Sequence, residues 1–428
     1  MQVEGKNMHP RYPESGQTIL LVAASLVAIL AMAALAIDVV TLYTARSEAQ
    51  RAADAAAIAA AKMLADTGLT TDPCNAALAT TAQTLATQQA TVVAQQNRVA
   101  GLAAQTINVT FPNYSAGAGC PNAFGVNPQV TVNLQRTGLP TFFARLWSST
   151  LASVSASATA EAYNPSNSST VVAGPVAPVA PRCAKPLLLP NEDPNHAGQH
   201  FVDPTTGAIA NRGLSGVVNN LLTLTSGCQP GFPTCNVNPN PPAAGTYVPL
   251  MMSPSALHIC PSCGSALSGF ASDLACCNAF ALQCGQQYNL DLSVDPDGAG
   301  GAAQTGGQCL IHQSPGNGQD TVDATQIPPE ITAGDNNPFV AGGTVAAGDA
   351  ITNSDSIVML PLFDDTIPFT GTGPVTIIGY LQVFIVDVDG TGTVHARVLN
   401  VIGCGNSLTG PPVQGSGASV PVRLIQQP

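Results

Sequence analysis

Charge is scarce in this chain: 9% of its 428 residues are Asp, Glu, Lys or Arg, and it has three lysines and one tryptophan. A typical soluble domain has about 25% charged residues. The 13 basic residues against 25 acidic ones give a net charge of −12, which leaves little to neutralise a phosphate backbone and argues against nucleic-acid binding. The loop G-x-x-x-x-G-K-[ST] is also missing, which argues against a P-loop nucleotide enzyme.

The shortage of positive charge is confined to the second part of the chain. Residues 1–181 carry eight basic and eight acidic residues, whereas residues 182–428 carry five and seventeen. This pattern predicts an acidic, solvated exterior that repels anionic surfaces. Hydrophobic residues are nevertheless 45% of the total, so the chain can build a core. The 40 glycines and 35 prolines predict long turn-rich stretches.

One apolar run has the length of a membrane span. Thr18 to Ile37 is free of charge, and at 1.5 Å per residue it covers roughly 30 Å of hydrocarbon. Lys6 and Arg11 precede it, and Arg46 and Arg51 follow it, so the basic residues alone give only a weak orientation bias. A cytoplasmic tail of residues 1–17 and a transmembrane helix over 18–37 are favoured mainly because the cysteine-bearing bulk of the chain follows the run. The bulk of the chain would then be periplasmic or extracellular.

A cleavable signal peptide is the alternative interpretation of this run. Ala31-Met32-Ala33 and Ala34-Leu35-Ala36 both have the small-x-small pattern that signal peptidases recognise. The run is longer than the usual signal core of about 7–15 residues and continues into a further helical segment. The sequence therefore favours a retained anchor and leaves cleavage open.

Alanine recurs every four residues after the apolar run. This spacing puts the row on one face of a helix, and small side chains let another backbone approach closely. The row therefore predicts a helix contact, although alanine also simply favours helix. The candidate contact residues are Ala45, Ala49, Ala53, Ala57 and Ala61.

The segment from about residue 14 to 62 resembles the amino-terminal module of TadG-like Flp pilus-assembly proteins, in the TadE/TadG-like family. The resemblance rests on the apolar run, an Ala-Ala-Asp-Ala-Ala-Ala string and these signature residues: Gly16, Gln17, Asp38, Tyr43, Arg46, Gln50, Ala53 and Asp54. It implies a single-pass protein of the bacterial inner membrane whose exported part works with the tight-adherence machinery. Its implied partners are the membrane and other pilus-assembly or pilin-like proteins. The resemblance brings no catalytic residue and no cofactor.

The exported part begins as a helix followed by a small sheet. Residues 75–100 predict a second helix, and apolar alternation predicts three strands. These strands lie at residues 107–111, 130–134 and 154–162, with a short apolar helix at 140–147 between the last two. Residues 38–163 would thus form a helical stalk and a small pilin-like α/β domain.

Proline and serine mark the boundary of a second domain. Residues 164–181 predict a linker, and residues 182–428 predict a cysteine-rich, acidic, mainly antiparallel β domain. Its clearest strands are at 357–363, 376–388 and 393–403, and the Gly/Asp-rich stretch 291–356 is expected to form surface loops. The predicted fold class is α+β.

All twelve cysteines follow the apolar run, an arrangement typical of disulfides formed outside the cytosol. The candidates are Cys74, Cys120, Cys183, Cys228, Cys235, Cys260, Cys263, Cys276, Cys277, Cys284, Cys309 and Cys404. The first two could pair with each other, and the adjacent Cys276 and Cys277 are expected to take different partners. Cys260-x-x-Cys263 leaves two alternatives open, a zinc site and a thiol redox site.

Short-spaced carboxylates followed by glycine give one metal hypothesis. Asp291, Asp295 and Asp297 precede Gly298, and Asp387 and Asp389 precede Gly390. Such groups can bind calcium through oxygen, although Asp-Gly is also ordinary turn chemistry and the EF-hand spacing is missing. No other cofactor is expected. Asp-x-Ser-x-Ser, the metal motif of some longer relatives, is not matched by the string starting at Asp291.

These observations favour a non-enzymatic, membrane-anchored component of Flp pilus assembly that acts through helix–helix and surface contacts. The first alternative is a secreted or pilus-borne, adhesin-like binding module in cell adhesion. The second is a periplasmic thiol-disulfide oxidoreductase using Cys260 and Cys263.

Overall fold

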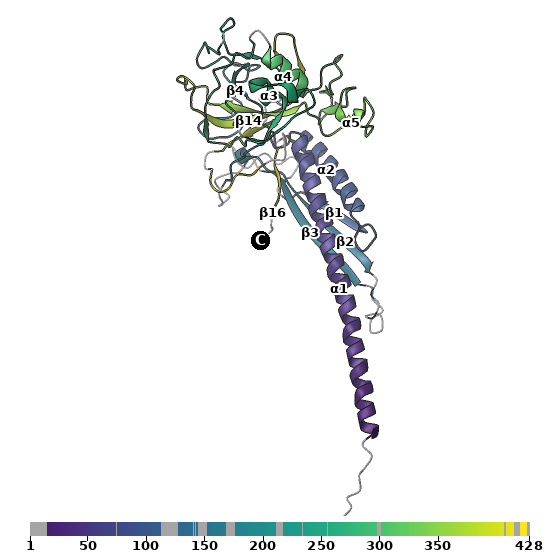
Figure 1. The fold of residues 1–428 in the computed structure, drawn as a ribbon. Helices are drawn as coiled ribbons and strands as arrows, with labels where there is room; N and C mark the ends of the chain where they lie inside the picture. Colours follow the sequence, from purple (N-terminus) through teal and green to yellow (C-terminus); the bar gives the residue numbers. More distant parts are fainter. Residues whose placement is uncertain are drawn as a thin grey trace, which may run out of the picture. The chain divides into compact units, whose positions relative to one another are not determined.

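A computed structural model describes most of the chain (Figure 1). The described residues are 15–73, 75–112, 127–139, 141, 143, 152–167, 176–210, 217–232, 234–254, 256–297, 301–405, 408–414 and 420–425. The chain divides into two compact units. The first consists of residues 1–53, 94–108 and 133–157, and the second of residues 54–93, 109–132 and 158–428.

The apolar run and the alanine stalk form one unbroken helix, α1 (Ser15–Asp66). Neither glycine nor proline interrupts residues 17–66, so nothing in the sequence breaks the helix. It ends just before Gly68, whose φ of +80° is a left-handed conformation that glycine adopts without strain. A Cβ at Gly68 would also lie 3.1 Å from Val218 and 3.2 Å from the Leu399 carbonyl.

The second helix, α2 (Ala76–Gln96), confirms the helix predicted over residues 75–100. The Asn75 side chain accepts hydrogen bonds of 3.1 Å from the backbone N–H groups of Ala77 and Leu78. Such an N-cap satisfies donors that a helix start leaves unpaired. One face of α2 is alanine and fully buried, at Ala79, Ala82, Ala86, Ala90 and Ala94.

The three strands predicted before the proline-rich stretch are confirmed. They are β1 (Thr106–Thr110), β2 (Gln129–Leu139) and β3 (Ala152–Ala162). A fourth strand, β16 (Val422–Ile425), completes the sheet order β1-β2-β3-β16. Arg423 of β16 forms an ion pair of 2.6 Å with Glu161 of β3. The helix expected at 140–147 falls mostly outside the described residues.

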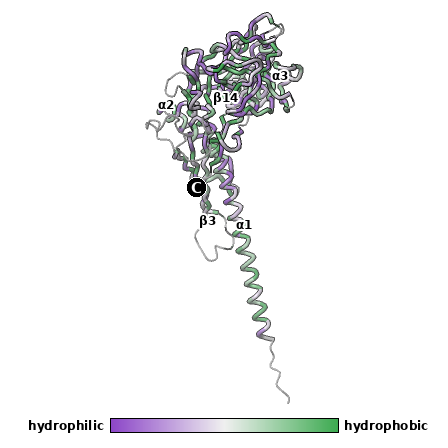
Figure 2. Tube along the Cα trace, turned by 90° about the vertical axis from the view of Figure 1, so that its left-hand side faces the viewer, coloured by the Kyte–Doolittle hydropathy of each residue, from purple (hydrophilic) through white to green (hydrophobic). Residues whose placement is uncertain are grey.

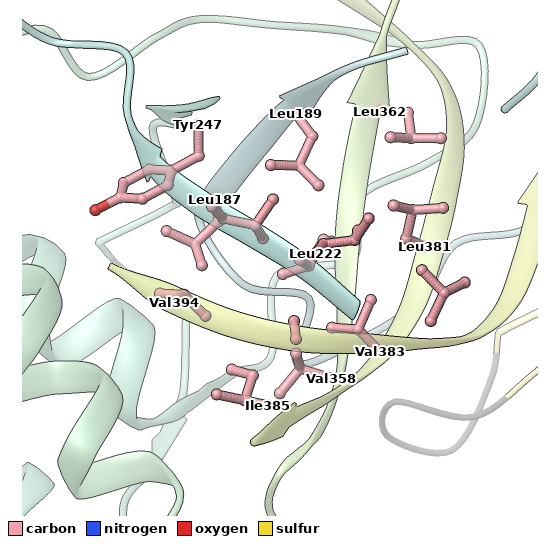
Figure 3. Packing of buried hydrophobic residues seen from close by; sticks show 14 of the residues in the cluster. Leu187, Leu189, Leu222, Tyr247, Val358, Leu362, Leu381, Val383, Ile385 and Val394 are labelled. Carbon is pink, nitrogen blue, oxygen red and sulfur yellow. The ribbon is translucent and has the colours of Figure 1, made fainter. Parts of the chain in front are cut away.

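A ring of six strands carries the main core of the second unit (Figure 3). The strands are β4 (Leu187–Pro190), β5 (Leu221–Ser226), β6 (Thr246–Pro249), β13 (Ile357–Phe363), β14 (Val375–Val388) and β15 (Val394–Gly403). The order is β13-β4-β6-β5-β15-β14, and β14 pairs again with β13, which closes a barrel. The pairings β13–β4 and β5–β6 are parallel and the other four are antiparallel.

Aliphatic side chains fill this barrel. Leu187, Leu222, Leu381, Val383 and Val394 are at most 1% exposed and belong to one apolar cluster. Figure 3 shows these side chains converging from different strands. The strands predicted at 357–363, 376–388 and 393–403 are thus confirmed as β13, β14 and β15.

Short elements surround the barrel. The strands are β7 (His258–Ile259), β8 (Cys277–Asn278), β9 (Gln287–Tyr288), β10 (Thr321–Asp323), β11 (Glu330–Thr332) and β12 (Ala350–Ile351). The helices are α3 (Gly269–Ala275), α4 (Ala302–Leu310) and α5 (Pro338–Ala341). β10, β11 and β12 form a separate antiparallel sheet, and β7 pairs with β8.

The prediction that residues 291–356 are surface loops is wrong for α4 and for the β10-β11-β12 sheet. Two glycines in α4 suggested a loop, but they allow close packing. A Cβ at Gly306 would lie 2.6 Å from the Ala271 carbonyl oxygen of α3, and one at Gly307 would lie 2.8 Å from Val388 of β14. The described parts of the stretch 164–181 are mostly buried, with Pro165–Asn167 in a 3₁₀ turn. The division between the two units falls elsewhere.

Candidate functional site

The first half of α1 is mostly hydrophobic (Figure 2), and its large apolar side chains are exposed. Ile19 is 71% exposed, Leu30 60% and Val40 63%. In length and composition this helix could cross a membrane, and it lies near the amino terminus. An apolar helix surface of this kind is stable in hydrocarbon and not in water, because exposed aliphatic side chains favour an apolar environment.

Asp38 marks where the helix starts to be covered by the rest of its unit. It is 2% exposed, and its Oδ2 accepts a hydrogen bond of 3.0 Å from the backbone N–H of Phe143. Ala34, one turn earlier, is 7% exposed, and Ala45 and Ala49, further along, are 2% and 1% exposed. Asp38 therefore contacts another segment of the chain at the end of the apolar run.

The five candidate contact alanines are buried in the chain itself. Ala45 and Ala49 lie in the first unit, and Ala53, at the end of that unit, is fully covered, as are Ala57 and Ala61 in the second. The contacts that this row makes here are intramolecular. A partner helix could reach the row only if the elements that cover it moved away.

The remaining signature residues of α1 present a mostly polar, accessible face. Gly16 lies in its first turn, and Gln17, Arg46 and Gln50 are exposed, with Asp54 half-buried. Gln50 donates a hydrogen bond of 3.0 Å to the Ser157 carbonyl. Tyr43 is 76% exposed at the end of the apolar stretch, a position typical of aromatic residues at a membrane–water interface.

Disulfides brace the second unit, and the ten cysteines that the structure describes are all bonded. The pairs are Cys183–Cys277, Cys228–Cys235, Cys260–Cys276, Cys263–Cys309 and Cys284–Cys404. Cys74 and Cys120 lie outside the described residues. The prediction of a disulfide framework is confirmed for these ten, and Cys276 and Cys277 do take different partners.

The redox and zinc interpretations of Cys260-x-x-Cys263 are wrong for the folded chain. A thioredoxin-like site needs these two sulfurs to bond with each other, and a zinc site needs free thiolates. Cys260 is instead bonded to Cys276, and Cys263 to Cys309. Both cysteines tie the β7 region to neighbouring segments.

The five candidate calcium carboxylates are spread over several contacts. Asp291 accepts from Ser293, Asp295 from the backbone of Asp297, Asp387 pairs with His395, and Asp389 accepts from Thr391 and Thr393. In the described ranges, no group of three or more His, Cys, Asp or Glu is placed to hold a metal ion. Calcium binding stays a prediction.

Tyr247 and Asp297 form the most buried part of this acidic region. The Tyr247 hydroxyl lies 3.3 Å from Asp297 Oδ1 and donates to it. Burial raises the pKa of Asp297, while the hydrogen bond from Tyr247 acts in the opposite direction. Burial together with the nearby charge of Asp297 raises the pKa of Tyr247 well above its ordinary value. The pair therefore has the character of a structural contact between barrel and loop.

A cavity in the second unit brings together residues that sequence reasoning missed. Its volume is about 930 Å³, near the upper end of the range for small-molecule sites. Two of the three lysines in the chain, Lys62 and Lys185, line it, together with His312, Asp355 and Asp66. The only signal in the sequence that could have drawn attention to these residues is that lysine is rare in this chain. Nothing in the sequence indicates that two of the three lysines share one cavity.

Lys185 is the most buried charged group of this cavity, at 3% exposed. Its Nζ donates a hydrogen bond of 2.8 Å to the Cys276 carbonyl. Burial lowers its pKa to about 7 from an ordinary value of 10.5, although Asp355 and Asp273 act in the opposite direction. Lys62 is more exposed and pairs with Asp66 at 2.6 Å.

Comparison with known proteins gives one result for the amino-terminal segment. Residues 16–63 match the family model of TadE/G-like Flp pilus-assembly domains. This match confirms the resemblance seen in the sequence, over a minority of the chain. Neither the curated proteins nor the solved structures gave a match.

Proposed function

We propose that this chain is a non-enzymatic, membrane-anchored component of Flp, or tight-adherence, pilus assembly. The observation that carries the proposal is the position of the family match along α1. The family match at residues 16–63 covers both the exposed apolar part of α1 and the stretch where α1 becomes covered by the rest of the chain. Anchor and folded stalk thus belong to one module.

In the proposed topology, residues 18–37 cross the bacterial inner membrane and the amino terminus is cytoplasmic. Lys6 and Arg11 precede the span, and Arg46 and Arg51 follow it, so the positive-inside rule does not decide the orientation. The five disulfides of the described residues lie after the span, and an oxidising compartment lets such bonds form and persist. The disulfides support a periplasmic or extracellular location for the bulk of the chain.

The proposed action is by contact with the membrane and with other pilus-assembly or pilin-like proteins. Because the alanine row is buried, the accessible parts of α1 include its apolar span and the exposed side chains of Tyr43, Arg46 and Arg51. We expect partner proteins to contact these residues. The alanines instead hold α1 against its own chain.

Complementation tests the role. The host would be a deletion strain for this gene whose parent strain assembles Flp pili. Three versions would be compared: the full chain, a chain with residues 18–37 replaced by an unrelated apolar span, and residues 38–428 exported behind a cleavable signal. We expect the first to restore surface pili and the third to fail. The second reports whether the span contributes more than anchoring. Normal pili in the deletion strain itself would refute the role.

A secreted or pilus-borne module is the second candidate. Cleavage after Ala33 or Ala36 would cut the exposed part of α1 and leave Asp38 with its partner Phe143. The folded part could therefore survive processing. Amino-terminal sequencing of native protein from washed membranes and from culture supernatant separates the two cases: a full-length membrane form supports the anchor, and a released form starting near Ile37 supports the module.

A further inference from the structure

We propose that the cavity lined by Lys185 binds an amphipathic carboxylate, with the carboxylate at Lys185 and the apolar part along the aliphatic and proline walls. The inference concerns only the second unit and does not depend on a role in pilus assembly. It assigns a small-molecule site to a region that lies almost entirely outside the family match.

The first argument is the incomplete bonding of Lys185. An ammonium group has three donors, and the described residues supply one acceptor, the Cys276 carbonyl. Its nearest acidic neighbours already have partners: Asp355 pairs with His312 at 2.9 Å, and Asp273 pairs with His258 at 2.8 Å. Lys185 thus has no direct ion pair among the described residues, although Asp355 and Asp273 act on it from further away. A buried cation without a direct partner is costly, and an anion in the cavity would relieve that cost.

The second argument is the composition of the walls. Apolar residues from several different segments line the cavity, among them Ile259, Leu310, Pro328, Pro329, Ile351 and Leu399. Ile259 is 65% exposed, so part of this apolar surface is accessible from outside. Mostly apolar walls with a few convergent polar groups are typical of sites for small organic ligands.

The third argument is selectivity for a single negative charge. Lys62 already pairs with Asp66 at 2.6 Å, which leaves Lys185, among the described residues that line the cavity, as the lysine without an ion pair. Asp66 and Asp355 also line the cavity, and their negative charge disfavours ligands with several anionic groups. A monocarboxylate with an uncharged apolar chain has one negative charge for Lys185 and no further charge that the acidic residues would repel.

The expected binding reaction includes a proton. With a pKa of about 7, Lys185 is mostly neutral at pH 8. A carboxylate beside it favours the ammonium form and raises its pKa. At pH 8 we therefore expect close to one proton to be taken up per carboxylate bound. The other titratable groups near Lys185 or in the cavity wall are Asp273, Asp355, His312, Lys62 and Asp66.

Selective labelling of lysine with ¹³C at Cε makes the test direct, because the chain gives three lysine signals. The full chain in lipid nanodiscs would be titrated with hexanoate, with hexan-1-ol as the neutral control and hexylamine as the cationic control. We expect hexanoate to shift the Lys185 signal and raise its titration midpoint, with little effect from either control. Lys185→Met identifies the signal.

Isothermal titration with the same probe gives the affinity. We expect Lys185→Met to weaken hexanoate binding by at least about thirtyfold, and Lys185→Arg, which keeps the cation, to weaken it less. Arg51→Met removes a basic side chain that is exposed and does not line the cavity; it is the matched control and should change the affinity by less than about threefold. Lys185→Arg also keeps the test valid if the methionine variant fails to fold.

Three results would overturn the proposal. One is the failure of hexanoate to move the Lys185 signal. A second is equal binding of hexanoate and hexan-1-ol, which would make the cavity an apolar groove without a role for the cation. The third is unchanged hexanoate affinity in folded Lys185→Met protein. If a peptide with a free terminal carboxylate binds in the cavity and hexanoate does not, the cavity would be reassigned to a protein partner.

Discussion

The carboxylate of Asp38 accepts a 3.0 Å hydrogen bond from the backbone N–H of Phe143, which lies 105 residues further along the chain. The bond joins the end of the apolar run to the segment between β2 and β3. Before Asp38, α1 exposes large apolar residues such as Leu35. Asp38 therefore has a structural role in the folded chain: its side chain contacts another segment at the point where the exposed apolar part of α1 ends.

Replacing Asp38 should loosen this junction. We expect Asp38→Ala to leave the Phe143 N–H without its acceptor, at a cost of about 1–3 kcal/mol. Asp38→Asn keeps an acceptor oxygen and should lose less. Hydrogen exchange at the Phe143 amide, measured by NMR on the chain in nanodiscs, would check this. Equal protection in the wild type and in Asp38→Ala would show that the bond does not hold the segment.

Larger side chains at the buried alanine positions of α1 should lower the stability of the chain. Ala57 is fully buried, whereas Arg51 on the same helix is exposed. Because packed interiors resist extra volume, we expect Ala57→Leu to destabilise the chain by about 1–3 kcal/mol. Arg51→Leu introduces the same side chain at a solvated position and should leave the apparent melting temperature nearly unchanged. Similar melting temperatures for both variants would contradict the packing role.

The same two variants separate folding from partner contact in the cell. If α1 meets other pilus proteins through its exposed face, Arg51→Leu should reduce the number of surface pili while the protein stays folded and abundant. Ala57→Leu should reduce pili only as far as it lowers the amount of folded protein. Immunoblotting of membranes, alongside pilus counts, distinguishes a lost contact from a lost protein.

Hydrophobic periodicity in the sequence predicted much of the fold. The glycine content of residues 291–356 led to a wrong loop prediction where the glycines allow close packing. The unbroken helix from Gln17 to Asp66 and the β-branched strands β13 to β15 followed from local pattern, because burial on one face imposes it. Gly306 and Gly307 suggested a loop, yet their missing side chains are what let α4 approach its neighbours. The parallel pairings that close the barrel join strands distant in sequence, and no local pattern records them.

Only those parts of the candidate site that lie within one continuous segment could be predicted from the sequence. The apolar run and the candidate signature residues lie in consecutive turns of α1, so the sequence contains them directly. The direction in which the alanine row faces depends on what covers it, and only the structure gives that. The cavity is lined by residues of α1, α4 and α5, of strands that include β11, β13, β14 and β15, and of loops. Lys62 and Lys185 are 123 positions apart in the sequence, so no local pattern relates them.

Disulfide removal should have effects that scale with the loop each bond closes. Cys284–Cys404 closes a separation of 120 residues and Cys228–Cys235 one of 7. Chain-entropy arguments give about 5 kcal/mol for the long loop and about 2 kcal/mol for the short one. We therefore expect the Ser/Ser variant of the first pair to unfold at clearly lower urea concentration than that of the second. A reversed order would indicate that local packing, and not loop closure, dominates.

Lys185 should make stability depend on pH in a way that its removal abolishes. Its pKa is about 7 in the folded chain against an ordinary 10.5, so between these pH values the unfolded chain binds more protons than the folded one. The contribution of Lys185 is therefore destabilising below pH 7, on the order of a few kcal/mol, and disappears as pH rises towards 10.5. In the wild type, this group makes stability increase with pH across that window.

Lys185→Met should lack this increase. We expect the variant to gain stability relative to the wild type most strongly at pH 6 and least at pH 9.5, with the lost hydrogen bond to the Cys276 carbonyl offsetting part of the gain at every pH. Melting temperatures measured from pH 6 to 9.5 for the wild type, Lys185→Met and Lys62→Met would decide. Lys62→Met removes the same charge from a half-exposed position and should run parallel to the wild type. A Lys185→Met curve that is also parallel would mean that Lys185 keeps an ordinary pKa, and carboxylate binding at pH 8 would then proceed without the expected uptake of a proton.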